Sequence, residues 1–192
     1  MKKVDNMKHL KRFTNAKQTT LANVRIENGN ITATNGNILL QLHDIALPSI
    51  DTVMDVKTLK MKDEYFPKID HHLNKESYTF IQLEKNEITT VLKYCKAIKK
   101  EPILSLVALK DQKSVSFKTK NSEALTFDID KIMGRSVSLL VKPDYFIKVF
   151  DYLNDSMGKS ETVSIEIRDE KSPIKFKTVG AILLVCPLVE RY

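Results

Sequence analysis

The sequence has little of several residues on which common protein functions depend. Its 192 residues include 2 cysteines, 5 glycines and no tryptophan. Cys95 falls in an expected helix and Cys186 in an expected strand, so we expect two reduced, buried thiols and no disulfide framework. The chain also lacks the GxxxxGKS/T and GxGxxG patterns of phosphate-binding loops. These absences argue against a disulfide-rich secreted protein and against the common nucleotide-binding enzymes.

Long hydrophobic runs are also missing. No apolar stretch approaches the roughly 18 residues that a membrane-spanning helix needs. The first residues, 1–5, lack the apolar core of a signal peptide. We therefore expect a cytoplasmic protein without membrane contact, in which a chain that is 42% hydrophobic buries one or two cores.

The histidines and carboxylates form no recognisable catalytic or metal-binding pattern. His71 and His72 are adjacent and so point apart in regular structure, which favours a solvated segment over a metal pair. His9 and His43 have no partner at a motif spacing, and no Ser-His-Asp or Cys-His arrangement can be defined. We expect no catalytic residue, no metal site and no cofactor.

The charge is positive, with 31 Lys and Arg against 24 Asp and Glu, a net charge of +7 and a pI near 9.2. Such a surplus suggests contact with a polyanion, most often nucleic acid, although many basic proteins bind none. Lysine outnumbers arginine, which suits diffuse attraction to phosphates better than reading of bases. The aromatic residues do not cluster as single-strand stacking requires.

The first part of the chain predicts one helix followed by a meander of strands, because apolar residues recur at helical spacing and two Asn-Gly turns then separate alternating segments. We expect a helix over 5–16 and strands over 21–27, 31–34, 38–42 and 52–59. Residues 55–62 are also compatible with a short helix. Residues 71–77 are polar and predict a linker.

The same order of elements then recurs twice. We expect a strand, a helix and three strands over 78–83, 86–100, 103–109, 114–119 and 124–129, and again over 136–141, 143–154, 163–167, 174–178 and 181–185. Asn86 is expected to cap the second helix, and Pro143 suits the first position of the third. A strand–helix–three-strand unit, βαβββ, therefore repeats three times, which predicts an α+β protein.

This repeat resembles the DNA sliding clamp of the bacterial β-clamp type. Residues 137–146 (VSLLVKPDYF), 172–177 (SPIKFK) and 184–188 (LVCPL) look like successive steps of the last clamp domain. Residues 20–24, 29–34 and 65–67 resemble the opening and the close of an earlier one. The resemblance implies a clamp fold with antiparallel sheets outside and short helices inside a ring. It implies a reduced clamp-like domain over 1–72, a linker over 73–77 and a complete clamp domain over 78–192.

A clamp of this family catalyses nothing and encircles duplex DNA, to which it tethers a polymerase after a clamp loader has placed it there. The residues that would face the DNA are cations on the expected helices: Lys8, Lys11, Arg12, Lys93, Lys96, Lys99, Lys100 and Lys148. The plainer interpretation is that these side chains only solvate the outer faces of amphipathic helices. The third helix also carries Asp144, Asp151 and Asp155, and so offers little attraction to DNA.

In this family, partner proteins insert a short apolar peptide beside the closing strand. The matching positions are Leu184, Cys186, Pro187 and Leu188. Leu184 is equally compatible with ordinary core packing, whereas Pro187 and Leu188 lie beyond the strand and suit a partner surface better. The opposite wall of this pocket cannot be placed from the sequence.

Rings of this family contain a dozen βαβββ units, so a chain with three units predicts a homotetramer. A helix over 55–62 would make four units and a trimer, and a dimer is a further possibility. The chain departs from the family in its short length, its single N-terminal unit and its basic charge. The compact length suggests a phage or another mobile element. Two alternatives remain: a non-encircling clamp-fold protein that regulates or decoys replication proteins, and an unrelated basic DNA-binding module.

Overall fold

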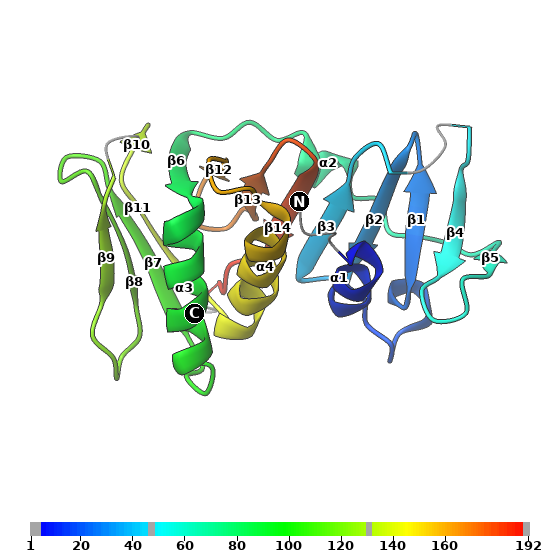
Figure 1. Cartoon of the computed structure of the whole chain (residues 1–192), viewed down its shortest axis with the longest axis horizontal. Coiled ribbons are helices and arrows are strands. Elements are labelled where there is room, and N and C mark those ends of the chain that lie inside the picture. Colours follow the sequence, from blue (N-terminus) through cyan, green and yellow to red (C-terminus); the bar gives the residue numbers. More distant parts are fainter. Residues whose placement is uncertain (1–4, 46–48, 130–131, 190–192) are drawn as a thin grey trace.

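The computed structural model of the chain describes residues 5–45, 49–129 and 132–189 (Figure 1). Its helices are α1 (Asn6–Phe13), α2 (Asp70–Leu73), α3 (Lys85–Ala97) and α4 (Pro143–Ser156), with a 3-10 turn at Thr19–Leu21. Its strands are β1 (Asn23–Glu27), β2 (Asn30–Thr34), β3 (Ile38–Leu42), β4 (Thr52–Asp55), β5 (Met61–Lys62), β6 (Thr79–Glu84), β7 (Leu104–Leu109), β8 (Ser114–Lys118), β9 (Leu125–Asp128), β10 (Ile132–Met133), β11 (Val137–Val141), β12 (Thr162–Ile167), β13 (Ile174–Lys177) and β14 (Ala181–Val185).

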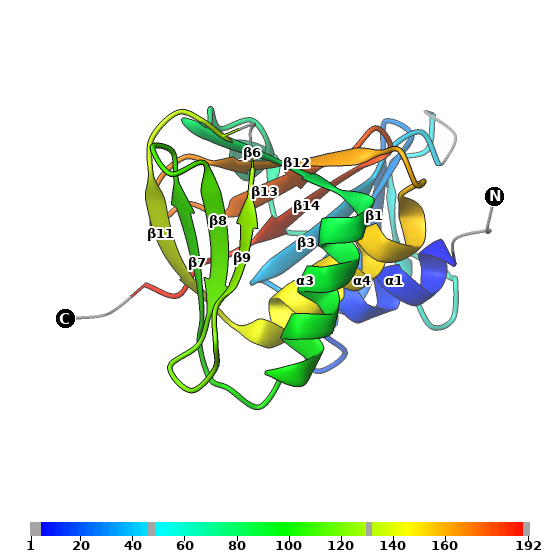
Figure 2. The same cartoon turned by 60° about the vertical axis from the view of Figure 1, so that its left-hand side comes forward.

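The strands form two antiparallel sheets, which confirms the α+β class. The larger has ten strands in the order β10-β6-β12-β13-β14-β3-β2-β1-β4-β5, and the smaller has four in the order β11-β7-β8-β9. Figure 2 shows the smaller sheet standing at an angle to the larger one, with α3 and α4 beside it. Strands from both expected domains lie in the larger sheet, because β14 pairs with β3 over five residues of each strand.

Three copies of one motif account for most of both sheets. Each of α1, α3 and α4 is followed by a three-stranded meander, namely β1–β3, β7–β9 and β12–β14. One further strand pairs with the first strand of each meander: β4 with β1, β11 with β7 and β6 with β12. The structure therefore contains the three cycles that the sequence predicts. Two strands pair outside their own cycle: β6, which precedes α3, pairs with the third meander, and β11, which precedes α4, pairs with the second.

Polar side chains cap the N-termini of α1 and α3. Asp5 caps α1 by accepting a hydrogen bond from the Lys8 backbone N–H at 3.0 Å, and extended backbone at Thr14 ends the helix before the predicted Ala16. The prediction that Asn86 caps α3 is wrong. The cap is Glu84, whose side chain and that of Glu87 bond to each other's backbone N–H groups in a capping box.

Residues 52–62 form neither the predicted long strand nor the alternative helix. Strand β4 ends at Asp55, whose carboxylate accepts hydrogen bonds from the backbone N–H groups of Lys57 and Thr58 at 2.8 and 2.9 Å. Leu59 then adopts a left-handed conformation with φ 58°, and the chain returns as β5. The polar segment at 71–77 is helical at its start, in α2, and irregular afterwards.

The core is continuous across the whole sheet. Cross-strand pairs such as Leu183 with Leu40 are fully buried at the β14–β3 junction. Four phenylalanines pack edge to face between the sheets and α4: Phe117, Phe146, Phe150 and Phe176. Of the two cysteines, Cys95 is buried in α3 as predicted, whereas Cys186 follows β14 and is half-buried; both are free thiols.

Candidate DNA-facing surface and partner pocket

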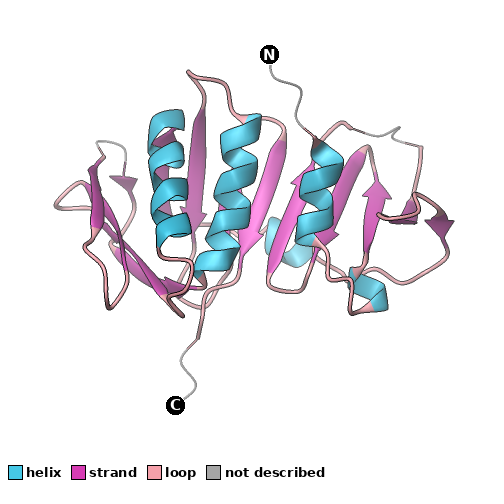
Figure 3. Cartoon of the chain, turned by 60° about the horizontal axis from the view of Figure 1, so that its bottom comes forward, coloured by secondary structure: helices cyan, strands magenta, loops and turns pink. Residues whose placement is uncertain are grey.

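The three long helices lie side by side on one face of the ten-stranded sheet, with α4 between α1 and α3 (Figure 3). Their apolar sides face the sheet, through Leu10 and Phe13 of α1 and through Ile88 and Val91 of α3, for example. The opposite sides therefore form a single surface, to which we give the name helix face. The cations predicted to face DNA all lie on or directly after these helices.

Six of these eight cations are exposed and two are half-buried. The exposed ones are Lys8, Lys11, Lys93, Lys96, Lys99 and Lys100, and the half-buried ones are Arg12 and Lys148. The structure thus brings the cations of the first two cycles together on the helix face, as a DNA-facing role requires. Contact of these cations with DNA is still a prediction.

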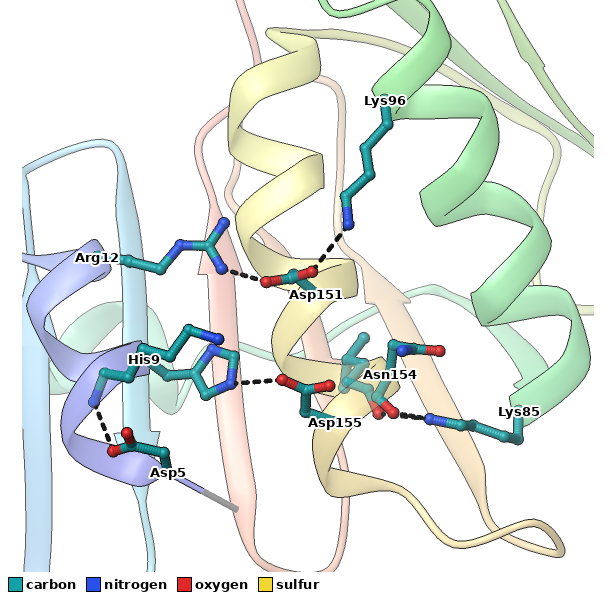
Figure 4. Close-up of polar contacts among 10 residues, drawn as sticks. Asp5, His9, Arg12, Lys85, Lys96, Asp151, Asn154 and Asp155 are labelled. Atoms are coloured by element: carbon teal, nitrogen blue, oxygen red, sulfur yellow. Dashed lines mark hydrogen bonds and ion pairs between the residues drawn. The ribbon is translucent and has the colours of Figure 1, made fainter. Parts of the chain in front are cut away.

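Asp151 of α4 ties the three helices together. Its carboxylate accepts a hydrogen bond from Arg12 of α1 and another, at 3.1 Å, from Lys96 of α3 (Figure 4). Burial raises the pKa of Asp151, but the two cations outweigh burial and hold this pKa below its usual value. Arg12 and Lys96 are consequently partly neutralised, and α4 positions the two helices beside it.

Two further residues of α4 contact the neighbouring helices. Asp155 accepts a hydrogen bond from His9 of α1 at 3.2 Å, and the Asn154 carbonyl accepts one from Lys85 of α3. His9 is only 1% exposed, and burial lowers its pKa more than Asp155 raises it. Sequence reasoning missed both contacts, because His9 and Lys85 read as isolated polar residues.

Lys148 differs from the other predicted cations. Burial lowers its pKa first, and the nearby charge of Arg12 lowers it further, while Asp144 acts in the opposite direction. Since burial also removes this side chain from solvent, Lys148 offers less to a polyanion than the exposed lysines of α3. The small contribution of the third helix to DNA attraction stays a prediction.

The predicted peptide pocket divides between two hollows. Leu184 and Cys186 line a cavity of about 160 Å³ at the β14–β3 junction. The rest of its lining, which the sequence did not reveal, comes from the 3-10 turn, from β3, whose Leu39 pairs with Leu184, and from the segment before α2: Leu21, Ile38, Leu39, Pro67 and Ile69. Leu184 is nearly buried, with 4% of its surface exposed, and burial raises the pKa of the Cys186 thiol. This cavity is mostly apolar and open to solvent.

Leu188 lies in the second hollow, of about 390 Å³, which is also lined by Leu139, Leu140 and Val189. Its backbone N–H donates to the Leu140 carbonyl at 2.7 Å, so the chain after β14 runs along β11. Pro187 is half-buried and lies between the two hollows in the sequence. The four predicted residues therefore follow one path that connects the two hollows.

Within the described ranges, no group of three or more His, Cys, Asp or Glu side chains is arranged to hold a metal ion. Among the helices that the structure describes, none has the length and apolar character needed to cross a bilayer.

Repeated helix–meander units, a basic helix face and an apolar cavity at a sheet junction together define the DNA-clamp class of folds. The chain superimposes on the DNA polymerase sliding clamp of Bacillus subtilis with a TM-score of 0.75 and 15% identity, over 97% of this chain and 63% of that chain. The Helicobacter pylori beta clamp bound to a DNA ligase peptide gives 0.74 and 15% over 96% and 62%. The Thermotoga maritima polymerase III beta subunit gives 0.74 and 10% over 96% and 63%.

These likenesses show that the chain has the sliding-clamp fold and that it spans less than two thirds of the length of those clamps. At identities of 10 to 15%, the likeness supports a shared fold but does not establish a shared function. No family model and no curated protein matches the sequence.

Proposed function

We propose that this protein is a sliding clamp: a non-catalytic, cytoplasmic ring that encircles duplex DNA and tethers a replicative polymerase. Residues 1–72 would supply a reduced clamp domain, 73–77 a linker and 78–192 a complete domain. The observation that carries the proposal is the helix face, where the lysines of α1 and α3 gather on one side of a clamp fold. Such a ring is loaded on DNA by a separate clamp loader.

Flexible lysines suit this task because they attract phosphates without fixing a register on the bases. A protein that must slide gains nothing from bidentate base contacts, which would hold it at one sequence. Processivity then comes from topology, since a trapped ring keeps its bound polymerase at a high effective concentration.

Four copies of the chain would supply the dozen units of the proposed ring. The hairpin of β4 and β5 stands where a fourth helix would be needed, so the count of units in the described residues stays at three. This count favours a tetramer over the trimer that a helix at 55–62 would have implied. A dimer with three units per chain would enclose only half of such a ring.

The cavity lined by Leu184 and Cys186 is the proposed docking site for partner peptides. Its apolar walls fit the side chains of an extended apolar segment, and Leu188 extends the surface toward the second hollow. The structurally similar Helicobacter pylori clamp was solved with a DNA ligase peptide bound. A polymerase or another replication protein would bind here by such a segment.

Retention on closed DNA tests encirclement. The protein is loaded on nicked circular plasmid with a clamp loader, washed at high salt and then treated with a restriction enzyme. A ring stays on the circle in salt that removes a direct phosphate binder, and it slides off once the DNA is linear. Release that depends on salt alone, with no effect of linearisation, would contradict the proposal.

Charge substitution tests the helix face in the same assay. Replacing Lys93, Lys99 and Lys100 together by glutamine is expected to weaken low-salt binding about tenfold or more, because each neutralised phosphate contact contributes to the salt dependence. A matched control replaces Lys57, Lys60 and Lys113, which lie outside the three helices. An equal loss in the control would indicate a diffuse charge effect.

The native cysteines provide a test of the pocket. Cys186 lines the cavity and should react slowly with a maleimide, whereas Cys95 is fully buried, with a pKa raised to about 12, and serves as an internal standard. An apolar polymerase-derived peptide is expected to protect Cys186 and leave Cys95 unchanged. An Ile69→Arg variant, with a charge in the wall that the segment before α2 supplies, should lose that protection.

One observation favours a second candidate function. Asp151 partly neutralises Arg12 and Lys96, which reduces the attraction of the helix face for DNA. A non-encircling clamp-fold protein that binds replication proteins as a regulator or decoy would need only the pocket. A stable monomer that protects Cys186 with the peptide but is not retained on circular DNA would support this second function.

A further inference from the structure

A third hollow adjoins the apolar cavity that Leu184 and Cys186 line. Its volume is about 590 Å³, against about 160 Å³ for the cavity. His72 and Pro173 line both spaces, and none of the residues around the third hollow belongs to α1, α3 or α4. The third hollow therefore borders the proposed partner pocket and lies apart from the helix face.

The sheet order places this hollow at one end of the apolar cavity. The cavity extends across neighbouring strands, in the order β13, β14, β3 and β2, from Pro173 directly before β13 to Thr34 on β2. The third hollow includes residues 169–173 and none from β14, β3 or β2. An extended segment that fills the cavity along this line would therefore reach the hollow on one of its two flanks.

Three exposed cations line the third hollow and come from different parts of the chain. Lys75 follows α2, Arg135 lies between β10 and β11, and Lys171 lies in the turn between β12 and β13. No salt bridge between described residues involves their side chains. Their charge is therefore available to an external anion.

The two carboxylates of the hollow do not cancel this charge. Asp169 accepts hydrogen bonds from the backbone N–H groups of Lys171 and Ser172 at 2.9 and 2.7 Å, and Arg168 Nε lies 3.6 Å from its carboxylate. Burial raises the pKa of Asp169, but these hydrogen bonds and the charge of Arg168 outweigh burial and hold this pKa below its usual value. Arg168 does not line the hollow and offsets Asp169 from outside, so Glu170 alone is left against three cations.

Backbone geometry holds Arg135 in place. Gly134 before it has φ 102°, and a Cβ there would lie 1.8 Å from the Tyr78 carbonyl oxygen, so only glycine allows this close approach. The Arg135 guanidinium lies over the Tyr78 ring, 5.3 Å from its centroid, and donates to the Arg168 carbonyl at 2.9 Å. A guanidinium positioned in this way has further N–H groups left for a carboxylate ligand.

We propose that the third hollow binds acidic side chains that flank the apolar anchor of a partner segment. The inference rests on the proposed docking site and adds to it the charge of the partner. Three cations against Glu170 favour an acidic ligand, and the shared border at His72 and Pro173 favours one continuous segment for both spaces. Burial lowers the pKa of His72, and His71 and Lys75 lower it further, so His72 adds no charge at neutral pH.

Peptide titration tests the charge preference. The probe is a short synthetic segment with a pair of leucines, made with glutamines on both flanks, with two glutamates before the leucines, or with two glutamates after them. Fluorescence anisotropy with the full chain should show that one of the two acidic forms binds about tenfold more tightly than the neutral form, and that added salt reduces this advantage. Equal affinity for all forms would overturn the proposal.

Paired variants locate the preference in the hollow. Lys75→Gln with Lys171→Gln should remove most of the advantage of the acidic form and leave the affinity for the neutral form unchanged, because both side chains are exposed and lie outside the apolar cavity. The matched control, Lys60→Gln with Lys68→Gln, removes the same charge outside the third hollow and should retain the advantage. An equal loss in both pairs would indicate attraction by net charge and contradict a localised site.

Further outcomes separate this inference from the proposed function. If the neutral form protects Cys186 and the acidic forms bind no better, the docking site stands and the inference about the third hollow is wrong. If no form binds or protects Cys186, the docking site fails and the inference fails with it. A single-stranded oligonucleotide that displaces the acidic form but not the neutral form would assign the third hollow to nucleic acid and reject the acidic partner.

Discussion

At the scale of single residues, acidic side chains of α4 bind polar side chains of the two neighbouring helices and neutralise part of their positive charge. Asp151 holds Arg12 and Lys96, and Asp155 holds His9, so three side chains of α1 and α3 point to α4 (Figure 4). Charge counted along the sequence therefore overstates the charge available to DNA. The exposed lysines at the end of α3, Lys99 and Lys100, form none of these contacts with α4 and carry the proposal best.

Replacing Asp151 by asparagine should separate positioning from attraction. The variant loses charge-assisted contacts that are partly buried, at a cost of about 1 kcal/mol in the free energy of unfolding. It also frees Arg12 and Lys96, which should tighten low-salt DNA binding. Asp144→Asn is the control, because it removes the same charge from an exposed position of α4. Equal loss of stability in the two variants, measured by urea denaturation, would contradict the role given to Asp151.

His9 should make the stability of the protein depend on pH. Burial lowers its folded-state pKa below the ordinary 6.5, so at lower pH the unfolded state takes up a proton more readily. The stabilisation is complete above 6.5 and is lost as the pH falls through the lower folded value. Urea denaturation from pH 7.5 to 5 should show this slope, and His9→Gln should reduce it. His43→Gln, at a half-buried site, should retain it.

At the scale of elements, sequence patterns located helices and strands, and they gave the exact bounds of β3 and β14 but not those of most other elements. Apolar spacing predicted the start of α3 to within one residue, and the reciprocal bonds of Glu84 and Glu87 fix this start at Lys85. The turn after β4 likewise depends on one carboxylate, that of Asp55. Its pKa is lowered to about 2, first by these backbone hydrogen bonds. Short polar contacts of this kind, and not the apolar periodicity, determine where these elements begin and end.

The capping box of α3 can be tested by paired substitutions. Glu87→Ala removes the acceptor for the Glu84 backbone N–H, which lies 2.6 Å from the carboxylate, and should destabilise the protein by about 1 kcal/mol. Glu87→Gln keeps an acceptor and should lose much less. Thermal unfolding followed by circular dichroism distinguishes the two, and equal melting temperatures would show that the box contributes nothing.

At the scale of the whole molecule, the junction of β3 and β14 makes one folding unit of two parts that are far apart in the sequence. The ten-stranded sheet and the three helices on its face share a continuous core, from Leu10 in α1 to Val185 in β14. The junction also forms the apolar cavity, because one wall belongs to each part. Folding and the shape of the cavity therefore depend on the same pairing.

Leu183→Ala should lower the free energy of unfolding of the whole molecule and not only of one half. Leu183 is fully buried at the junction opposite Leu40, and its truncation should cost about 2–5 kcal/mol. Hydrogen exchange should then rise together in peptides from β1–β3 and from β12–β14. Leu125→Ala at the half-buried sheet edge is the milder control. Loss of protection in only one of the two regions would contradict a single cooperative unit.

Alternating residues, Asn-Gly turns and apolar spacing determined the local elements, and repetition of those elements was enough to predict the βαβββ unit and its three copies. The same signals placed the lysines on helix surfaces, whereas only the resemblance to clamps pointed to Leu184 and Cys186, which line the cavity. These features are encoded by neighbours along the chain, where the period of side chains fixes which way each residue points.

Only the tertiary structure decided which strands meet across the two parts, which wall faces Leu184, and how Asp151, Asp155 and His9 pair between helices. Such contacts join residues separated by at least 55 positions, and no local pattern specifies them. Their stability comes from burying matched surfaces and charges together, so they exist only once the sheet has brought the helices side by side.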